Sequence, residues 1–102
     1  MDYQEVKTKK EYLNLLYKVI EESRLLANNN PSIKIYLSIY NQLTDVSILL
    51  NKGIVLKKEE IYDRYSFGAI AVKNFDCDED LYGRELQDLF GGLFDYPLMP
   101  EK

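Results

Sequence analysis

Apolar side chains recur along most of the chain at steps of three and four residues, which is the spacing of one face of an α-helix. The pattern is interrupted at Asn28-Asn29-Asn30, near Gly53 and at Asp76–Asp80. It therefore predicts helices over about residues 8–27, 31–51, 58–75 and 78–91. Because connections this short favour antiparallel neighbours, we expect a single all-α domain over residues 1–102, an antiparallel up-and-down four-helix bundle with an extended C-terminal tail.

Cap residues support the predicted helix ends. Thr8 and Glu11 have the spacing of a capping box, in which each side chain bonds the other residue's amide. Asn30-Pro31 offers an N-cap followed by a proline, whose missing amide needs no partner in the first turn of a helix. Gly53 suits the left-handed conformation that closes a helix, and Gly91-Gly92 is expected to stop the fourth helix.

Two segments between these ends are harder to assign. The run Ile54-Val55-Leu56 is β-branched and apolar, but no partner strand is visible, so we interpret it as a packed loop. In the third predicted helix, small residues suggest close packing of a neighbouring helix. Its expected inner face consists of Ile61, Tyr65, Gly68, Ala69 and Val72.

The tail over residues 93–102 contains two prolines and several large apolar side chains. It is too rich in proline to be helical and too apolar for an ordinary disordered end. We therefore expect the tail either to pack on the helices or to bind a partner.

Charge narrows the choice of partner. The net charge is -4 and the pI is about 4.8, whereas binding to DNA or RNA requires a dense field of Lys and Arg. Residues 1–58 carry nine Lys/Arg and six Asp/Glu, whereas residues 59–102 carry four and eleven. The asymmetry indicates either two differently solvated faces or an acidic half that meets a basic partner.

The sequence offers little for catalysis or for metal binding. It has no histidine, and its single cysteine, Cys77, lies between two aspartates that disfavour a thiolate. Asp76, Asp78 and Asp80 imitate the start of a calcium-binding loop, but Leu81 replaces the glycine that the turn requires. No phosphate-binding motif is present. We predict neither an enzyme nor a cofactor or metal site.

The cellular compartment is predicted from the features that the sequence lacks. No run approaches the roughly 20 apolar residues of a membrane-spanning helix, so we expect no insertion into a membrane. The first five residues lack the pattern of a secretion signal, and a single cysteine excludes an internal disulfide framework. These observations favour a cytoplasmic protein.

The order of signals resembles one known family. A capped first helix, an Asn-Pro second helix, a more apolar third and the closing segment Leu86–Tyr96 resemble the immunity proteins of class II (pediocin-like) bacteriocins, such as the enterocin A immunity protein. That resemblance implies a cytosolic bundle that protects a Gram-positive cell from a pore-forming peptide. The implied partner is the mannose phosphotransferase permease with bound bacteriocin, contacted from the cytosol.

The same resemblance implies that the C-terminal half determines specificity. Carried onto this chain, it points to partner-binding residues in the fourth helix and the tail: Tyr82, Phe90, Leu93, Phe94, Tyr96 and Leu98. Deletion of residues 94–102 would then abolish protection and leave a folded protein. The alternative that stays open is a small helical regulatory or adaptor protein that uses this surface to bind a soluble partner.

Overall fold

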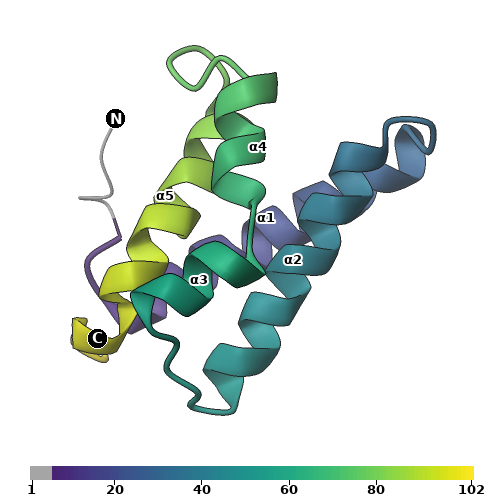
Figure 1. Ribbon diagram of the computed structural model, residues 1–102. Coiled ribbons are helices and arrows are strands. Elements are labelled where there is room, and N and C mark those ends of the chain that lie inside the picture. Colours follow the sequence, from purple (N-terminus) through teal and green to yellow (C-terminus); the bar gives the residue numbers. More distant parts are fainter. Residues whose placement is uncertain (1–5) are drawn as a thin grey trace.

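Residues 6–102 are described by the structure, a computed structural model (Figure 1). The first five residues, on which the absence of a secretion signal was argued, lie outside this range. The elements are α1 (Lys9–Asn29), α2 (Lys34–Asn51), α3 (Lys58–Arg64), α4 (Phe67–Asn74), α5 (Leu81–Asp95) and the short 3-10 helix η1 (Tyr96–Leu98).

The start of α1 is the predicted capping box. The Glu11 amide donates to Thr8 Oγ1 over 3.1 Å, and the Thr8 amide donates to Glu11 Oε1 over 3.1 Å. Two of the four amides that a helix start leaves unpaired are thereby satisfied within the chain.

The end of α2 also follows its sequence signal. Gly53 has a positive φ of 74°. Its amide donates to the Leu50 carbonyl over 3.1 Å, and the Ile54 amide donates to the Leu49 carbonyl over 3.0 Å. This pair of bonds is a Schellman motif. The residues that follow form the expected loop, but only Leu56 packs against the core, because Ile54 and Val55 are exposed.

The predicted start of α2 was wrong. Asn30 ends α1 instead, because its amide and its side-chain Nδ2 both donate to the Leu26 carbonyl, over 2.9 and 3.0 Å. Pro31 consequently lies in the turn between the two helices, and α2 begins at Lys34 after the N-cap residue Ile33.

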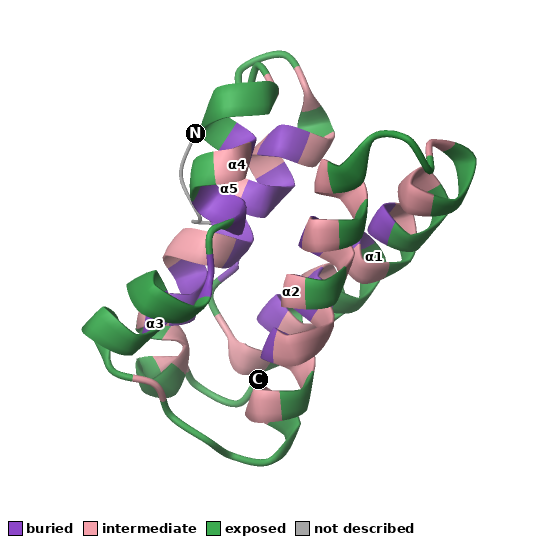
Figure 2. Ribbon diagram, turned by 45° about the vertical axis from the view of Figure 1, so that its right-hand side comes forward, coloured by how far each residue is buried: buried purple, intermediate pink, exposed green. Residues whose placement is uncertain are grey.

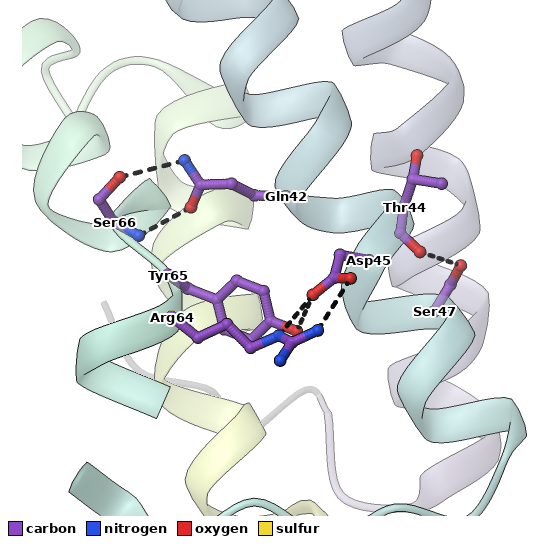
Figure 3. Close-up of polar contacts among 7 residues, drawn as sticks. All are labelled: Gln42, Thr44, Asp45, Ser47, Arg64, Tyr65 and Ser66. Carbon is purple, nitrogen blue, oxygen red and sulfur yellow. Dashed lines mark hydrogen bonds and ion pairs between the residues drawn. The ribbon is translucent and has the colours of Figure 1, made fainter. Parts of the chain in front are cut away.

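The third predicted helix is broken in two. Tyr65 is extended, with φ -126° and ψ 139°, so that α3 ends and α4 starts in a new direction. Gln42 of α2 holds the break: its Oε1 accepts from the Ser66 amide over 2.7 Å, and its Nε2 donates to Ser66 Oγ over 3.0 Å (Figure 3). A side chain from α2 thus satisfies an amide that a continuous helix would have paired internally.

A second set of side-chain contacts, from Asp45 one turn further along α2, also stabilises the break between α3 and α4. We call these contacts of Asp45 with Arg64 and Tyr65 a clasp. Asp45 Oδ2 accepts from Arg64 Nε over 2.7 Å and from the Tyr65 hydroxyl over 2.7 Å, while Arg64 Nη2 donates to Asp45 Oδ1 over 3.2 Å (Figure 3). The Arg64 guanidinium holds the pKa of Asp45 below its ordinary value. Charge-assisted bonds of this kind are stronger than neutral ones.

The break changes which residues of this region face inward. Phe67, Gly68 and Ala71 of α4 are buried, whereas Ala69 and Val72 are exposed, contrary to the prediction. Gly68 was correctly assigned to close helix packing, because a β-carbon there would lie 2.6 Å from Phe90 Cγ of α5.

The glycines of α5 do not stop that helix. Instead, α5 continues through Gly91 and Gly92 to Asp95. A β-carbon on Gly92 would lie 3.0 Å from Cε2 of Tyr12, so this glycine allows α1 and α5 to approach closely. The prediction that Gly-Gly ends the helix was wrong for that reason.

Cross-contacts show that α1 and α5 run antiparallel. The Tyr12 hydroxyl donates to the Leu89 carbonyl over 2.6 Å near one end, and the Ser23 and Tyr82 hydroxyls lie 2.7 Å apart near the other. The buried residues lie on the inward faces of the helices (Figure 2). The largest fully buried apolar side chains are Tyr12, Leu16, Val19, Ile39, Leu43, Val46, Ile61, Phe67, Leu86 and Leu89.

The tail packs on the start of α1 instead of extending from the helices. The Tyr96 ring meets the Tyr12 ring edge-on at 5.3 Å between centroids, and the Lys9 amide donates to the Pro100 carbonyl over 2.8 Å. The all-α prediction is confirmed, whereas a regular four-helix bundle is not, because residues 6–102 form five α-helices and a 3-10 turn.

Candidate protein-interaction site

Three aromatic rings from α3 and α5 form one cluster. Phe90 and Phe94 lie one turn apart on α5, with ring centroids 5.5 Å apart. Tyr62 of α3 lies 5.9 Å from Phe90 and 5.1 Å from Phe94. The buried Phe67 packs against the cluster: its ring centroid lies 5.2 Å from that of Phe90, and the two ring planes are at 86°. We call Tyr62, Phe90 and Phe94 the aromatic face.

The aromatic face is partly open to solvent. Tyr62 is 59% exposed, while Phe90 and Phe94 are half-buried against the core. Rings held in this way lose little conformational freedom on binding and carry a large apolar area, which is why aromatic residues are enriched at protein interfaces.

Three acidic residues are close in sequence to the rings of the aromatic face, two in α3 and one in α5. Glu59 precedes Tyr62 by one turn of α3, Asp63 follows it directly, and Asp95 follows Phe94. All three are exposed, and within residues 6–102 none of them forms an ion pair or side-chain hydrogen bond. We call Glu59, Asp63 and Asp95 the acidic rim.

A second aromatic cluster lies at the other end of α5. Tyr82 contacts Phe75 at 5.4 Å and Tyr36 of α2 at 6.4 Å between centroids. The Tyr82 hydroxyl is bonded to Ser23, and burial raises the pKa of Tyr82 to about 12. The exposed apolar residues next to this cluster in sequence are Ile33, Leu37, Val72 and Leu81.

An apolar cavity of about 290 Å³ lies between the end of α2, the loop after it and the tail. Its walls include Val46, Leu49 and Ile61, and Lys9 and Glu101 border it and form an ion pair at 3.2 Å. A volume of this size can accept an apolar side chain or a small ring.

Buried charge occurs on the contact between α1 and α5. The Glu85 carboxylate, 7% exposed, pairs through Oε2 with the Lys18 ammonium. The Oε1 atoms of Glu85 and Glu22 are buried with no hydrogen-bond partner among the described residues. Burial, and next the charge of Glu85, raise the pKa of Glu22 above its ordinary value.

No group of three or more side chains in residues 6–102 is arranged to hold a metal ion. In the segment that imitates a calcium loop, Asp80 caps α5 by accepting from the Tyr82 amide over 2.9 Å, and Asp76 Oδ1 accepts from the Asp78 amide over 3.1 Å. Both carboxylates therefore serve the local backbone.

The six residues predicted to bind a partner do not form one surface. Phe90 and Phe94 share the aromatic face, as their spacing on a helix requires. Tyr82 belongs to the second cluster, near the other end of α5. Tyr96 packs on Tyr12, so it holds the tail to α1.

The remaining two predicted residues differ in burial. Leu93 is 5% exposed and belongs to the core, whereas Leu98 is 88% exposed. Sequence reasoning missed Tyr62 as a neighbour of Phe90 and Phe94. The only signal was its helical spacing to Tyr65, which does not reveal that α3 lies beside α5.

Comparison with known protein families identifies the family of this chain. The family model Tsi6 matches residues 11–94, from the first turn of α1 to nearly the end of α5. The chain belongs to the Tsi6 family. The name is that of a type VI secretion immunity protein. No curated protein and no solved structure matches the chain.

Membership of the Tsi6 family overturns the resemblance to pediocin-like bacteriocin immunity proteins. That resemblance rested on size, helix order and the segment Leu86–Tyr96, none of which is a sharp signature of a family. The expectation of an immunity protein is retained in its general form. The permease as partner was implied only by the rejected resemblance and is not retained. None of the helices in residues 6–102 has the length and hydropathy to cross a bilayer.

Proposed function

We propose that this protein is an immunity protein that binds the toxic domain of a type VI effector and blocks its activity. The observation that carries the proposal is the Tsi6 family match over residues 11–94. A soluble adaptor would use similar binding surfaces, but no observation favours it over immunity.

Neutralisation by binding requires a rigid surface rather than reactive groups. The sequence has no histidine, and its one cysteine is free and half-buried next to α4. The helices are held together by clasps that fix their relative positions, such as Asp45 with Arg64 and Tyr12 with Leu89. A preorganised surface binds with little loss of conformational entropy, which favours a tight complex with the toxin.

We further propose that the protein acts in the cytoplasm, where it would meet a toxin delivered into the cell. In this mechanism one immunity protein occupies one toxin and excludes the toxin's substrate. Protection would therefore saturate when the toxin outnumbers the immunity protein, unlike protection by an enzyme that turns over.

The test is survival of a sensitive bacterium that co-expresses the chain with each of a panel of type VI effector toxin domains. We expect full survival with at least one toxin domain and no survival with most others. The control is the Leu16→Asp variant, which places a charge in the core and should not fold. Absence of protection across a broad panel would contradict the proposal.

A further inference from the structure

We propose that the aromatic face and its acidic rim form the surface that contacts the partner, and that they receive a basic segment of it. In this complex an Arg or Lys side chain of the partner lies over the exposed rings, and its charge meets the carboxylates of the rim. The identification of the partner as a toxin rests on the proposed function.

The first support comes from the exposed ring. Tyr62 is 59% exposed although its ring centroid lies within 6 Å of those of Phe90 and Phe94. The cluster therefore leaves the ring of Tyr62 accessible to solvent. Arg and Lys are attracted to aromatic rings within about 6 Å of the centroid, and Arg also stacks on them.

The second support comes from the unused carboxylates. Several other acids of the described chain are engaged by cations: Asp45 by Arg64, Glu85 by Lys18 and Glu101 by Lys9. The acidic rim has no such partner among the described residues: Arg64, next to Asp63 in α3, is paired with Asp45, and Lys58, next to Glu59, forms no ion pair. Because Asp45 engages Arg64, the three carboxylates of the rim face only the Lys58 ammonium in α3, and this local excess of negative charge complements a basic segment.

The second aromatic cluster does not combine these two properties. The Tyr82 hydroxyl is already bonded to Ser23, and its neighbour Asp80 caps α5. Asp78 and Glu79 are exposed near that cluster, but they lie in the turn before α5, and the rings closest to them in sequence are half-buried. These two acids therefore provide a matched control for the acidic rim.

One test needs no knowledge of the toxin. The uniformly ¹⁵N-labelled protein is titrated with the peptide acetyl-Arg-Leu-Arg-Leu-Arg-amide, and amide chemical shifts are followed by NMR. We expect the shifts to concentrate at residues 58–63 and 90–95. Equal or larger shifts at residues 76–80 would overturn the proposal, because they would show that any acidic segment suffices.

The second test uses a toxin domain that the protein neutralises in the survival assay, purified as an inactive variant. The double variant Glu59→Lys/Asp63→Lys and the control Asp78→Lys/Glu79→Lys both change the net charge from -4 to 0. We expect the first to weaken binding by at least about tenfold and the control by less than about threefold. Loss of affinity in the control alone would overturn the proposal.

The variant Tyr62→Ala separates the ring from the charges. Its side chain is largely exposed, so circular dichroism and thermal melting should remain close to those of the unchanged protein. We expect weaker toxin binding by about tenfold, typical of an aromatic residue at the centre of an interface. The matched control is Leu37→Ala, at a residue of α2 that is 54% exposed.

The two proposals fail in different ways. If no toxin is neutralised but the peptide binds residues 58–63 and 90–95, the proposal of a toxin as partner is rejected. The proposal that this surface binds a basic segment is then retained. If a toxin is neutralised and all variants of the aromatic face and acidic rim bind it normally, immunity stands and this surface is rejected.

Discussion

The ring of Phe90 occupies the space that a β-carbon on Gly68 would need, at 2.6 Å from the ring's Cγ. We therefore predict that Gly68→Ala destabilises the protein. Overpacking a core contact costs about 1–3 kcal/mol, against a gain of about 1 kcal/mol in helix propensity. Urea unfolding measures the net change, which should be a loss.

Replacement of Phe90 provides the check on this cause. In the variant Phe90→Leu the smaller side chain leaves room for a methyl group on residue 68, so the double variant should lose less stability than the two single changes together. Strictly additive losses would show that the strain at Gly68 does not come from Phe90.

The clasp between Asp45 and Arg64 predicts a pH-dependent contribution to stability. Because Arg64 lowers the pKa of Asp45, the contribution is present above the pKa of Asp45 in the unfolded chain and is lost as the pH falls through its folded value. We expect Asp45→Asn to lower the free energy of unfolding by about 1 kcal/mol near neutral pH and by little in acid.

The control for the clasp is Glu21→Gln. Glu21 pairs with Arg24 on the exposed surface of α1, where solvent screens the interaction, so its loss should change the free energy of unfolding less than Asp45→Asn does. An equal effect of Asp45→Asn in acid and at neutral pH would show that the amide disrupts packing instead of removing a charge.

The partly buried carboxyl of Glu22 predicts the opposite pH dependence. Its folded pKa is raised by burial and by Glu85, so the fold favours the protonated form. Stability is highest below the unfolded pKa and falls as the pH rises towards the folded pKa, because only the unfolded chain releases the proton there. Glu22→Gln should therefore stabilise the protein at neutral pH and flatten this part of the profile.

Thermal melting from mildly acidic to neutral pH measures the effect of Glu22→Gln. The variant Glu59→Gln, at an exposed position of α3, should leave the slope unchanged. If Glu22→Gln also leaves the slope unchanged, the raised pKa of Glu22 does not cause this pH dependence.

The contacts of the tail predict graded effects of truncation. Deletion of residues 97–102 removes the bond from the Lys9 amide to the Pro100 carbonyl and should cost about 1 kcal/mol. Deletion of residues 94–102 also removes the rings of Phe94 and Tyr96, and loss of a packed aromatic ring costs about 3–5 kcal/mol.

Thermal melting of both truncations distinguishes a clasp from a free binding tail. In a domain of this size 1 kcal/mol corresponds to roughly 4–8 °C, so the longer deletion should lower the melting temperature by tens of degrees. Nearly equal melting temperatures for the two truncations would mean that the packing of Tyr96 on Tyr12 contributes little.

The sequence was most informative where a signal is local. The capping box of Thr8 and Glu11 and the left-handed Gly53 need only residues within one turn, and both were predicted correctly. The break at Tyr65-Ser66 was missed because Gln42, 24 residues away, supplies the bonds that stabilise it. Gly92 was misread for a related reason, since its role depends on Tyr12 of α1.

The candidate site was also predictable only where its residues are close in the sequence. The spacing of Phe90 and Phe94 places both rings on one face of a helix, and the structure agrees. Tyr62 joins them only because the break after α3 turns that short helix towards α5. No periodicity within residues 58–75 contains this information.

The pairing of Tyr12 with Leu89 and of Lys9 with Pro100 also governs the order of assembly during synthesis. The hairpin of α1 and α2 can form as soon as residue 53 has left the ribosome, but the inward side of α1 finds its last partners only after residue 100. Until then Tyr12, which is fully buried in the finished fold, lacks its contacts to Leu89 and Tyr96. Slow translation of the codons for residues 83–102 would therefore prolong an aggregation-prone intermediate.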